Sequence, residues 1–240
     1  MNLMGRRAYS VLLLLGLLWA AGLALFLRPT SAPAATKARA PKQLAAAAAL
    51  PVPPAQAPAV SRFDALPALR IENETSRGVL ERKLYDAQGR VDEAAAAELD
   101  ALLCDARDPK HHQTARIDRR TLQLLFKAAY HFASYEVEVV SAYRKPGRRR
   151  EGPHGTGAAI DFRLRGVTAS MLASYLREVP RTGVGVYTHP KTQYVHLDVR
   201  EHSFHWLDAS PPRRHWREKS LGARDLVARD EGYDPALDLP

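Results

Sequence analysis

The sequence predicts an α+β domain in which helices pack on one side of an antiparallel sheet. Two stretches with apolar residues at helical spacing come first in the foldable part of the chain. Short stretches that alternate apolar and polar residues follow, as half-buried strands do. Two of these are separated by residues 189–192, a spacing that predicts a hairpin. Helices followed by a strand-dominated half are typical of the α+β class.

Three helices are expected, and each has a recognisable start. Asp92 and Glu93 open the first helix, which runs to Leu103 with acidic residues at its beginning. Asp118 caps the second, which continues to Phe132 with one apolar stripe. Thr168 caps the third, which carries apolar residues as far as Val179.

Four strands are expected from β-branched or alternating stretches: Val137–Val140, Ala158–Leu164, Gly183–Thr188 and Tyr194–Arg200. In the second of these, Ile160 and Phe162 would face the core and Asp161 the opposite side. In the last, His196 and Asp198 share the face opposite the apolar residues. The polar faces of these two strands are therefore candidates for a functional site.

The N-terminus predicts export. Arg6 and Arg7 precede a nearly unbroken apolar run from Val11 to Leu27, so residues 1–28 are interpreted as a signal peptide or a signal anchor. Basic residues ahead of the run place that end in the cytoplasm and send the remainder outward. The chain is therefore expected to be periplasmic, either tethered to the inner membrane or secreted after cleavage near residues 32–34.

Residues 29–62 are rich in Ala and Pro, which favours an extended tether between the membrane and a folded domain at 63–240. The chain has room for one such domain. Its one cysteine, Cys104, has no partner for a disulfide or a CxxC site and is expected to be a small buried hydrophobe.

The charge balance points to anionic partners. The chain has 35 basic and 26 acidic residues, a formal net charge of +9, which suits nucleic acid, phospholipid headgroups or an acidic wall polymer. Aromatic residues are not interleaved with Lys and Arg as they are in base-stacking platforms, which argues against nucleic acid.

Two histidines and one aspartate form a candidate zinc site. His154 lies on a loop where Gly155 and Gly157 allow a sharp turn, and Asp161 follows seven residues later. If their strands are neighbours, Asp161 and His196 converge on one point and His154 closes from the loop. Three nitrogen or oxygen ligands with a fourth position for water are what a catalytic zinc needs. Taken singly, a surface histidine or an ion-paired aspartate is the commoner explanation of each residue, and it is their joint occurrence that favours a metal site.

These segments resemble a known family. The chain is similar to bacterial murein endopeptidases related to D-alanyl-D-alanine carboxypeptidases, in a superfamily with lysostaphin-type enzymes and the hedgehog domain. The segments that carry the similarity are Ser141-Ala-Tyr-Arg144, His154–Asp161, Gly183–Tyr187 and Tyr194-Val-His-Leu-Asp198. The similarity covers roughly 73–206. It implies that His154, Asp161 and His196 bind zinc and that Arg144 lies by the active site.

The resemblance implies a zinc-dependent hydrolase that cleaves peptide bonds in peptidoglycan stem peptides or crosslinks. Arg144 would then stabilise the oxyanion or hold a substrate carboxylate. Relatives place a Glu or His shortly before the last zinc ligand, but this chain has Gln193 and Tyr194 there. Asp198 and His189 are the two substitutes, and Asp198 is expected at the site, for proton transfer or for orienting His196. The missing base leaves a rival, a non-catalytic zinc module that binds peptidoglycan or a protein.

The other polar and aromatic residues are interpreted as inert or structural. Solvated loops explain His111, His112 and the Arg148–Arg150 run. Opportunistic metal binding is the most that is expected of three further histidines, and packing explains the tryptophans. These residues are His202, His205, His215, Trp206 and Trp216.

Overall fold

The computed structural model describes residues 61–240 except 106–115, 146–151, 215–217 and 223. The predicted signal or anchor at 1–28 and nearly all of the predicted tether lie outside this part. The same holds for His111, His112, the Arg148–Arg150 run, His215 and Trp216. Among the helices of the described part, none is long and apolar enough to cross a membrane.

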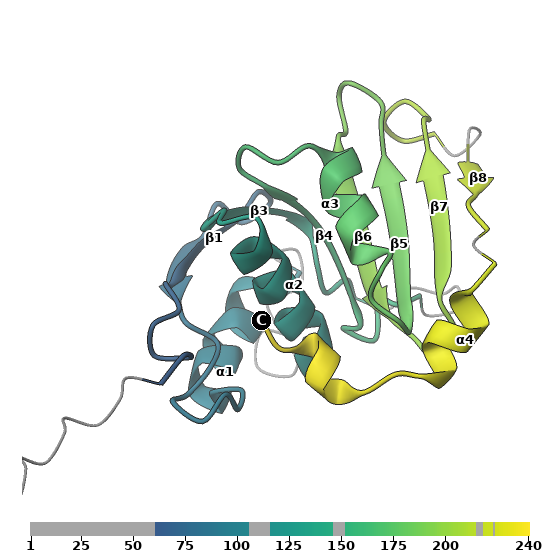
Figure 1. Ribbon diagram of the computed structural model, residues 1–240. Coiled ribbons are helices and arrows are strands. Elements are labelled where there is room, and N and C mark those ends of the chain that lie inside the picture. Colours follow the sequence, from purple (N-terminus) through teal and green to yellow (C-terminus); the bar gives the residue numbers. More distant parts are fainter. Residues whose placement is uncertain (1–60, 106–115, 146–151, 215–217, 223) are drawn as a thin grey trace, which may run out of the picture. The chain divides into compact units, whose positions relative to one another are not determined.

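The described residues form an eight-stranded sheet with the order β2-β1-β3-β4-β6-β5-β7-β8. Figure 1 shows β4, β6 and β5 at its centre. The strands are β1 Leu69–Asn73, β2 Val79–Arg82, β3 Glu136–Ser141, β4 Ala159–Leu164, β5 Thr182–Tyr187, β6 Tyr194–Val199, β7 Phe204–Asp208 and β8 Glu218–Ser220.

The sheet is mixed, so the expectation of a wholly antiparallel sheet is corrected. The pairs β1–β3 and β5–β7 are parallel, while the remaining neighbours are antiparallel. The two parallel pairs arise because α1 and α2 lie in the chain between β1 and β3, and β6 lies between β5 and β7. The predicted β5–β6 hairpin is confirmed, and it joins strands paired from Thr182↔Val199 to Tyr187↔Tyr194.

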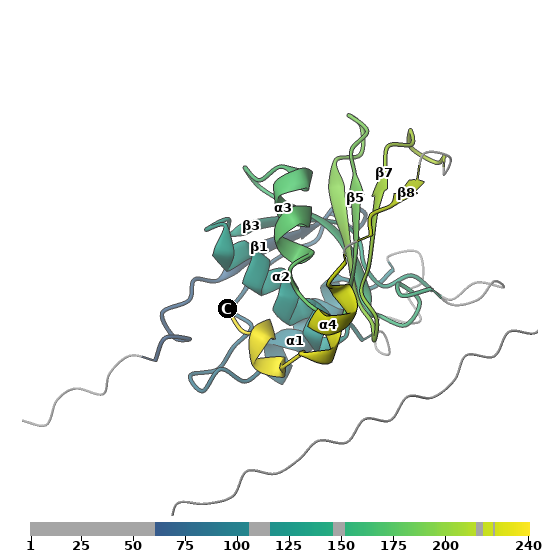
Figure 2. The same cartoon turned by 45° about the vertical axis from the view of Figure 1, so that its right-hand side comes forward.

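The three predicted helices are confirmed as α1 Glu93–Leu102, α2 Arg119–His131 and α3 Ala169–Leu176, and a short α4, Leu226–Glu231, was not predicted. Asp92, Asp118 and Thr168 cap α1, α2 and α3 through their side-chain oxygens. The third helix ends at Leu176 rather than at Val179. In both ribbon views α2 and α3 cover the same face of the sheet (Figures 1 and 2).

The core lies between this face and the helices. Apolar side chains of β4, β5 and β6 point toward α2 and α3, and their alternate neighbours point to the other face. The core also takes Leu99 and Leu103 from the end of α1, and Cys104 is buried beside it, as expected. The central fully or almost fully buried residues are Ile160, Phe162, Val184, Val186, Val195, Leu197, Leu122, Leu125, Phe126, Leu172 and Leu176.

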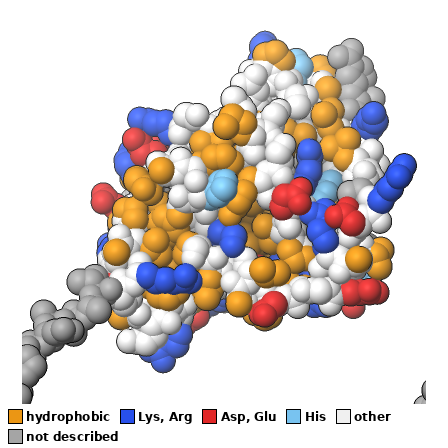
Figure 3. Space-filling view, viewed as in Figure 1, with side chains coloured by type: hydrophobic (Ala, Val, Ile, Leu, Met, Phe, Trp, Pro, Cys, Tyr) orange, Lys and Arg blue, Asp and Glu red, His pale blue; other side chains and the backbone are white. Residues whose placement is uncertain are grey.

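Hydrophobic and charged side chains are interspersed on the helix-covered face (Figure 3). Lys and Arg side chains stand there singly or beside Asp and Glu, so this view shows no surface of one charge sign. The excess of basic residues is therefore not gathered on the face that α2 and α3 cover.

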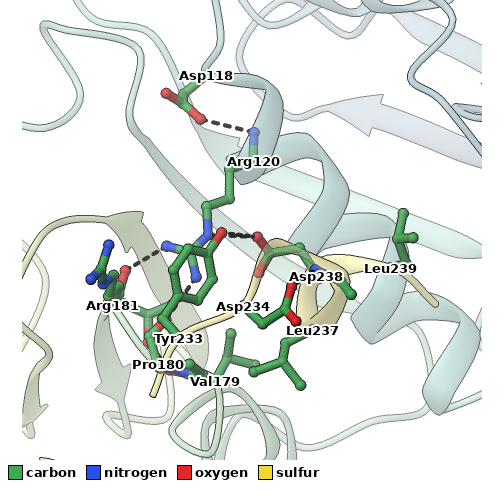
Figure 4. A network of polar contacts seen from close by, with 12 residues as sticks. Asp118, Arg120, Val179, Pro180, Arg181, Tyr233, Asp234, Leu237, Asp238 and Leu239 are labelled. Carbon is green, nitrogen blue, oxygen red and sulfur yellow. Dashed lines mark hydrogen bonds and ion pairs between the residues drawn. The ribbon is translucent and has the colours of Figure 1, made fainter. Parts of the chain in front are cut away.

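A polar network joins the C-terminal segment to α2 (Figure 4). Arg120 donates to the Asp238 carboxylate over 2.8 Å and to the carbonyls of Pro180 and Arg181 over 2.7 Å each. Tyr233 also donates to Asp238, and the Arg120 guanidinium lies over the Tyr233 ring. Asp238 is in the short helix η2, Pro235–Asp238, which is thereby fixed to the start of α2 and to the segment before β5.

Replacing Asp238 by Ala leaves the largely buried Arg120 without its counter-charge. We expect the free energy of unfolding to fall by about 3 kcal/mol, the usual order for a broken buried ion pair. Urea denaturation of the full-length chain measures this change. Arg82→Ala breaks the half-exposed pair with Glu98 and serves as the control, with a much smaller expected effect. Equal losses in the two variants would contradict this assignment.

Candidate metal centre

Strand register places two of the predicted ligands side by side. Asp161 on β4 is the direct cross-strand partner of His196 on β6, so both side chains stand on the same face. Their neighbours Ile160, Phe162, Val195 and Leu197 are fully buried on the helix side. The site therefore lies on the face of the sheet that α2 and α3 do not cover.

His154 reaches the same point from the loop before β4. Gly157 has φ +78°, and a Cβ there would overlap the Arg116 carbonyl, so this turn requires glycine. The loop is held by Arg144, whose backbone N–H donates to the His154 carbonyl over 3.1 Å, and by Thr121, which donates to the Ala158 carbonyl over 2.9 Å. The loop thus brings the imidazole to the sheet from outside the ladder.

The three side chains converge within bonding reach of one ion. His154 Nε2 lies 3.2 Å from His196 Nδ1 and 3.4 Å from Asp161 Oδ2, and His196 Nδ1 lies 2.8 Å from Asp161 Oδ1. All three ligand atoms lie within 4.8 Å of one another, and all three residues are buried. The predicted convergence of His154, Asp161 and His196 is therefore observed.

Hydrogen bonds at the far side of each imidazole decide which nitrogen faces the cluster. His154 Nδ1 lies 2.7 Å from the Ala142 carbonyl, which accepts only from N–H, so Nε2 carries the lone pair toward the cluster. His196 Nε2 lies 3.0 Å from Asp198 Oδ2, so an N–H there leaves Nδ1 facing Asp161 and His154. Both rings are held in the orientation that a metal ligand needs.

The electrostatics of the cluster favour a cation. Burial raises the pKa of Asp161, but the neighbouring His154 and His196 outweigh it and hold the pKa well below its usual range. Burial lowers the pKa of His196, while the bonds to Asp161 and Asp198 raise it to about 9, so without an ion Nδ1 carries a proton whose place the ion would take. Two ionised carboxylates beside these imidazoles thus stabilise positive charge between them.

The donor set fits a divalent metal such as zinc. Two imidazole nitrogens and one carboxylate oxygen are the ligands of many three-residue zinc sites. A tetrahedral ion with bonds of about 2.0–2.1 Å separates its ligands by about 3.3 Å, close to the 3.2 and 3.4 Å measured from His154. The side chains therefore need little movement to hold the ion.

Asp198 lies behind His196 rather than in the open part of the site. It is fully buried and accepts from Arg200 Nε over 2.6 Å and from a second guanidinium nitrogen of the same residue. Burial raises its pKa, but His196 and Arg200 together keep the pKa lowered. Gly183 leaves the room for this pair, since a Cβ there would overlap the Asp198 carboxylate. The geometry suits an orienting role better than proton uptake.

Arg144 is at the edge of the cluster, as expected from the sequence. Its Nη2 lies 3.7 Å from Asp161 Oδ2, and about half of its side chain is exposed. The guanidinium can therefore contact both the cluster and a group arriving from solvent. A 160 Å³ pocket lined by Asn73, Thr75, Ser141 and other residues adjoins it.

The other residues weighed from the sequence lie outside the cluster. His189 is in the β5–β6 turn, where its Nδ1 accepts from the Lys191 backbone. His202 is exposed, and His205 is buried on the helix face of β7. A role at the site was not predicted for Arg200 or Gly183. Two glycines spaced by one residue on a predicted strand are nevertheless a recognisable sign of a face that accommodates neighbouring side chains.

The comparison with protein families agrees with this geometry. The family model described as peptidoglycan L,D-endopeptidase MepK matches residues 67–206, which contain every residue of the cluster. The chain belongs to this family. Neither a curated protein nor a solved structure matches the chain.

Membership of the MepK family confirms the resemblance to murein endopeptidases and makes the chain a peptidase. It points to peptidoglycan endopeptidase activity in general. The match ends at Trp206 on β7, so the C-terminal segment that carries Asp238 lies beyond it.

The buried His205 predicts a pH dependence of stability. Burial, together with the charges of Arg177 and Arg229, lowers its pKa from 6.5 to about 4. The unfolded chain therefore takes up a proton between pH 6.5 and 4 that the folded chain does not, and stability falls as the pH drops through this window. We expect His205→Gln to remove about 3 kcal/mol of the loss between pH 7 and 4.

Denaturation of the full-length chain at several pH values measures this difference. His202→Gln changes an exposed neighbouring histidine and is expected to leave the pH profile unaltered. Identical profiles for the wild type and His205→Gln would show that His205 titrates normally in the folded chain.

Proposed function

We propose that this protein is a zinc-dependent peptidase that cleaves peptide bonds in the stem peptides or crosslinks of peptidoglycan during cell wall remodelling. The observation that carries the proposal is the buried cluster of two imidazoles and one carboxylate, with Nε2 of His154 and Nδ1 of His196 turned inward. In keeping with the description of its family, the scissile bond would join an L-configured centre to a D-configured one.

His154, Asp161 and His196 would hold the zinc. The bound ion supplies a water that is acidic near neutral pH and a Lewis acid for the scissile carbonyl. Asp198, hydrogen-bonded to His196 Nε2, would keep that ring oriented and make its Nδ1 a more basic metal ligand. The contact of Arg200 with Asp198 holds the carboxylate in turn.

Arg144 would stabilise the negative charge that develops on the carbonyl oxygen. Its guanidinium is 3.7 Å from Asp161 and half exposed, so it borders the space that a substrate must enter. The same fork is suited to a substrate carboxylate, the second role that the sequence left open. In both roles a lysine would serve less well, because it lacks the planar pair of donors.

We infer a periplasmic location from the sequence of the N-terminal segments. Residues 1–28 would direct the chain across the inner membrane and either anchor it or be removed, and residues 29–62 would separate the domain from the membrane. The domain would then meet peptidoglycan on the periplasmic side. The net charge of +9 favours contact with an anionic polymer.

One observation favours a second function, a non-catalytic module that binds peptidoglycan peptides. Gln193 and Tyr194 occupy the positions where related enzymes place a Glu or His. Burial raises the pKa of Tyr194, so its hydroxyl can donate a hydrogen bond but does not accept a proton near neutral pH. The two functions differ in whether a product is released.

Incubation of the full-length protein with purified crosslinked peptidoglycan tests the proposal. We expect crosslinked fragments to be converted to uncrosslinked ones, since an endopeptidase cuts within the bridge whereas a carboxypeptidase releases single amino acids. A chelator should abolish the conversion, and added zinc should restore it. His154→Ala should be inactive with or without zinc, while His189→Ala, a change in the exposed turn, should remain active.

Conversion that persists after complete metal removal would exclude the metal mechanism. Tight binding of peptidoglycan without any product, unchanged in His154→Ala, would instead support the binding module.

A further inference from the structure

A row of side chains continues from the metal cluster across the sheet to β7. Asp161 pairs with His196, His196 with Gly185 on β5, and Gly185 with Trp206 on β7. All four positions are on the face opposite the helices. Because Gly185 has no side chain, the position between His196 and Trp206 is open to a large neighbour.

The Trp206 indole occupies this position. A Cβ on Gly185 would lie 2.7 Å from the indole Nε1 and closer still to two of its ring carbons, so the ring rests directly on the Gly185 backbone. The centroids of the Trp206 and His196 rings are 5.1 Å apart, at an angle of 49°. The indole is thus the immediate neighbour of a proposed metal ligand, on the side away from Asp161.

Aromatic rings extend this surface outward. Phe204 stacks on Trp206 with centroids 5.8 Å apart, and 46% of Phe204 is exposed. Trp206 is only partly buried, and Tyr187 lies two residues beyond Gly185 on the same face of β5. Tyr187 in turn stacks on Tyr194, two residues before His196, with centroids 4.3 Å apart. The cluster is therefore bordered on the β5–β7 side by a continuous set of aromatic faces.

We propose that Trp206, supported by Gly185, is a substrate-binding residue on which the peptide next to the scissile bond packs. The ligand is a peptide segment, because planar amides and short aliphatic side chains lie flat on an indole placed beside the reacting centre. This inference rests on the proposed function, and it names the surface that would hold the substrate there. Packing of Trp206 against His196 alone would not require a partly exposed ring continued by the exposed Phe204.

Binding of a soluble crosslinked peptide dimer that carries no sugar tests this surface. Calorimetry is done with the full-length protein in the presence of a chelator, so that cleavage does not interfere. We expect Trp206→Ala to weaken binding about tenfold and Trp206→Phe to retain most of it. Gly185→Ala should weaken binding similarly, since its new Cβ displaces the intact indole.

Gly222→Ala is the matched control, because a Cβ at Gly222 meets nothing within 4 Å, and it should bind as the wild type does. Circular dichroism identifies variants that fail to fold, and Gly185→Ala decides the result if Trp206→Ala is one of them. Unchanged binding in both Trp206→Ala and Gly185→Ala would overturn the proposal. A defect seen only with intact peptidoglycan would also overturn it, because the surface would then contact the glycan.

The binding measurement separates this inference from the proposed function. A wild type that binds the dimer through Trp206 but never cleaves it would contradict the proposed function and leave the binding surface intact. A wild type that cleaves the dimer, with binding unaffected in every variant, would support the proposed function and contradict the binding surface. Failure of the wild type to bind the dimer at all would overturn the binding surface.

Discussion

The direct pairing of Asp161 with His196 is the constraint on which the site depends. It places a carboxylate and an imidazole on one face while Ile160, Phe162, Val195 and Leu197 fill the core on the other. A shift of one residue in this register would bury the clustered side chains and expose the core. The energy that fixes the hydrophobic core therefore also fixes the geometry of the cluster.

Polar contacts complete what the register begins. The Ala142 carbonyl and the Asp198 carboxylate each hold one imidazole from behind, so that Nε2 of His154 and Nδ1 of His196 face the cluster. Because backbone and buried groups already hold the imidazoles, the two rings lose little conformational freedom when a metal binds. The start of α2 supports the His154 loop through Thr121, and the Arg120 network in turn holds the C-terminal segment to that start. Stability and site geometry are thus coupled through α2.

Much of this could be predicted from the sequence, for reasons that differ between elements. The capping residues Asp92, Asp118 and Thr168 located the helices, and alternation located the faces of β4 and β6. The mixed character of the sheet could not be predicted, because strand order depends on contacts between distant segments. Strand β7 was missed since its buried position holds His205 and its other face holds Trp206, which reverses the usual polarity. The C-terminal elements were missed because side-chain hydrogen bonds, rather than a hydropathy pattern, fix them.

X-ray absorption spectroscopy of the zinc-loaded protein tests the central claim most directly. The account predicts a first shell of nitrogen and oxygen at about 2.0–2.1 Å, with the outer-shell scattering of two imidazoles. It also predicts no sulfur ligand, since Cys104 is the only cysteine and is not among the clustered residues. A spectrum with a sulfur ligand, or with fewer than two imidazoles, would contradict the site described by His154, Asp161 and His196.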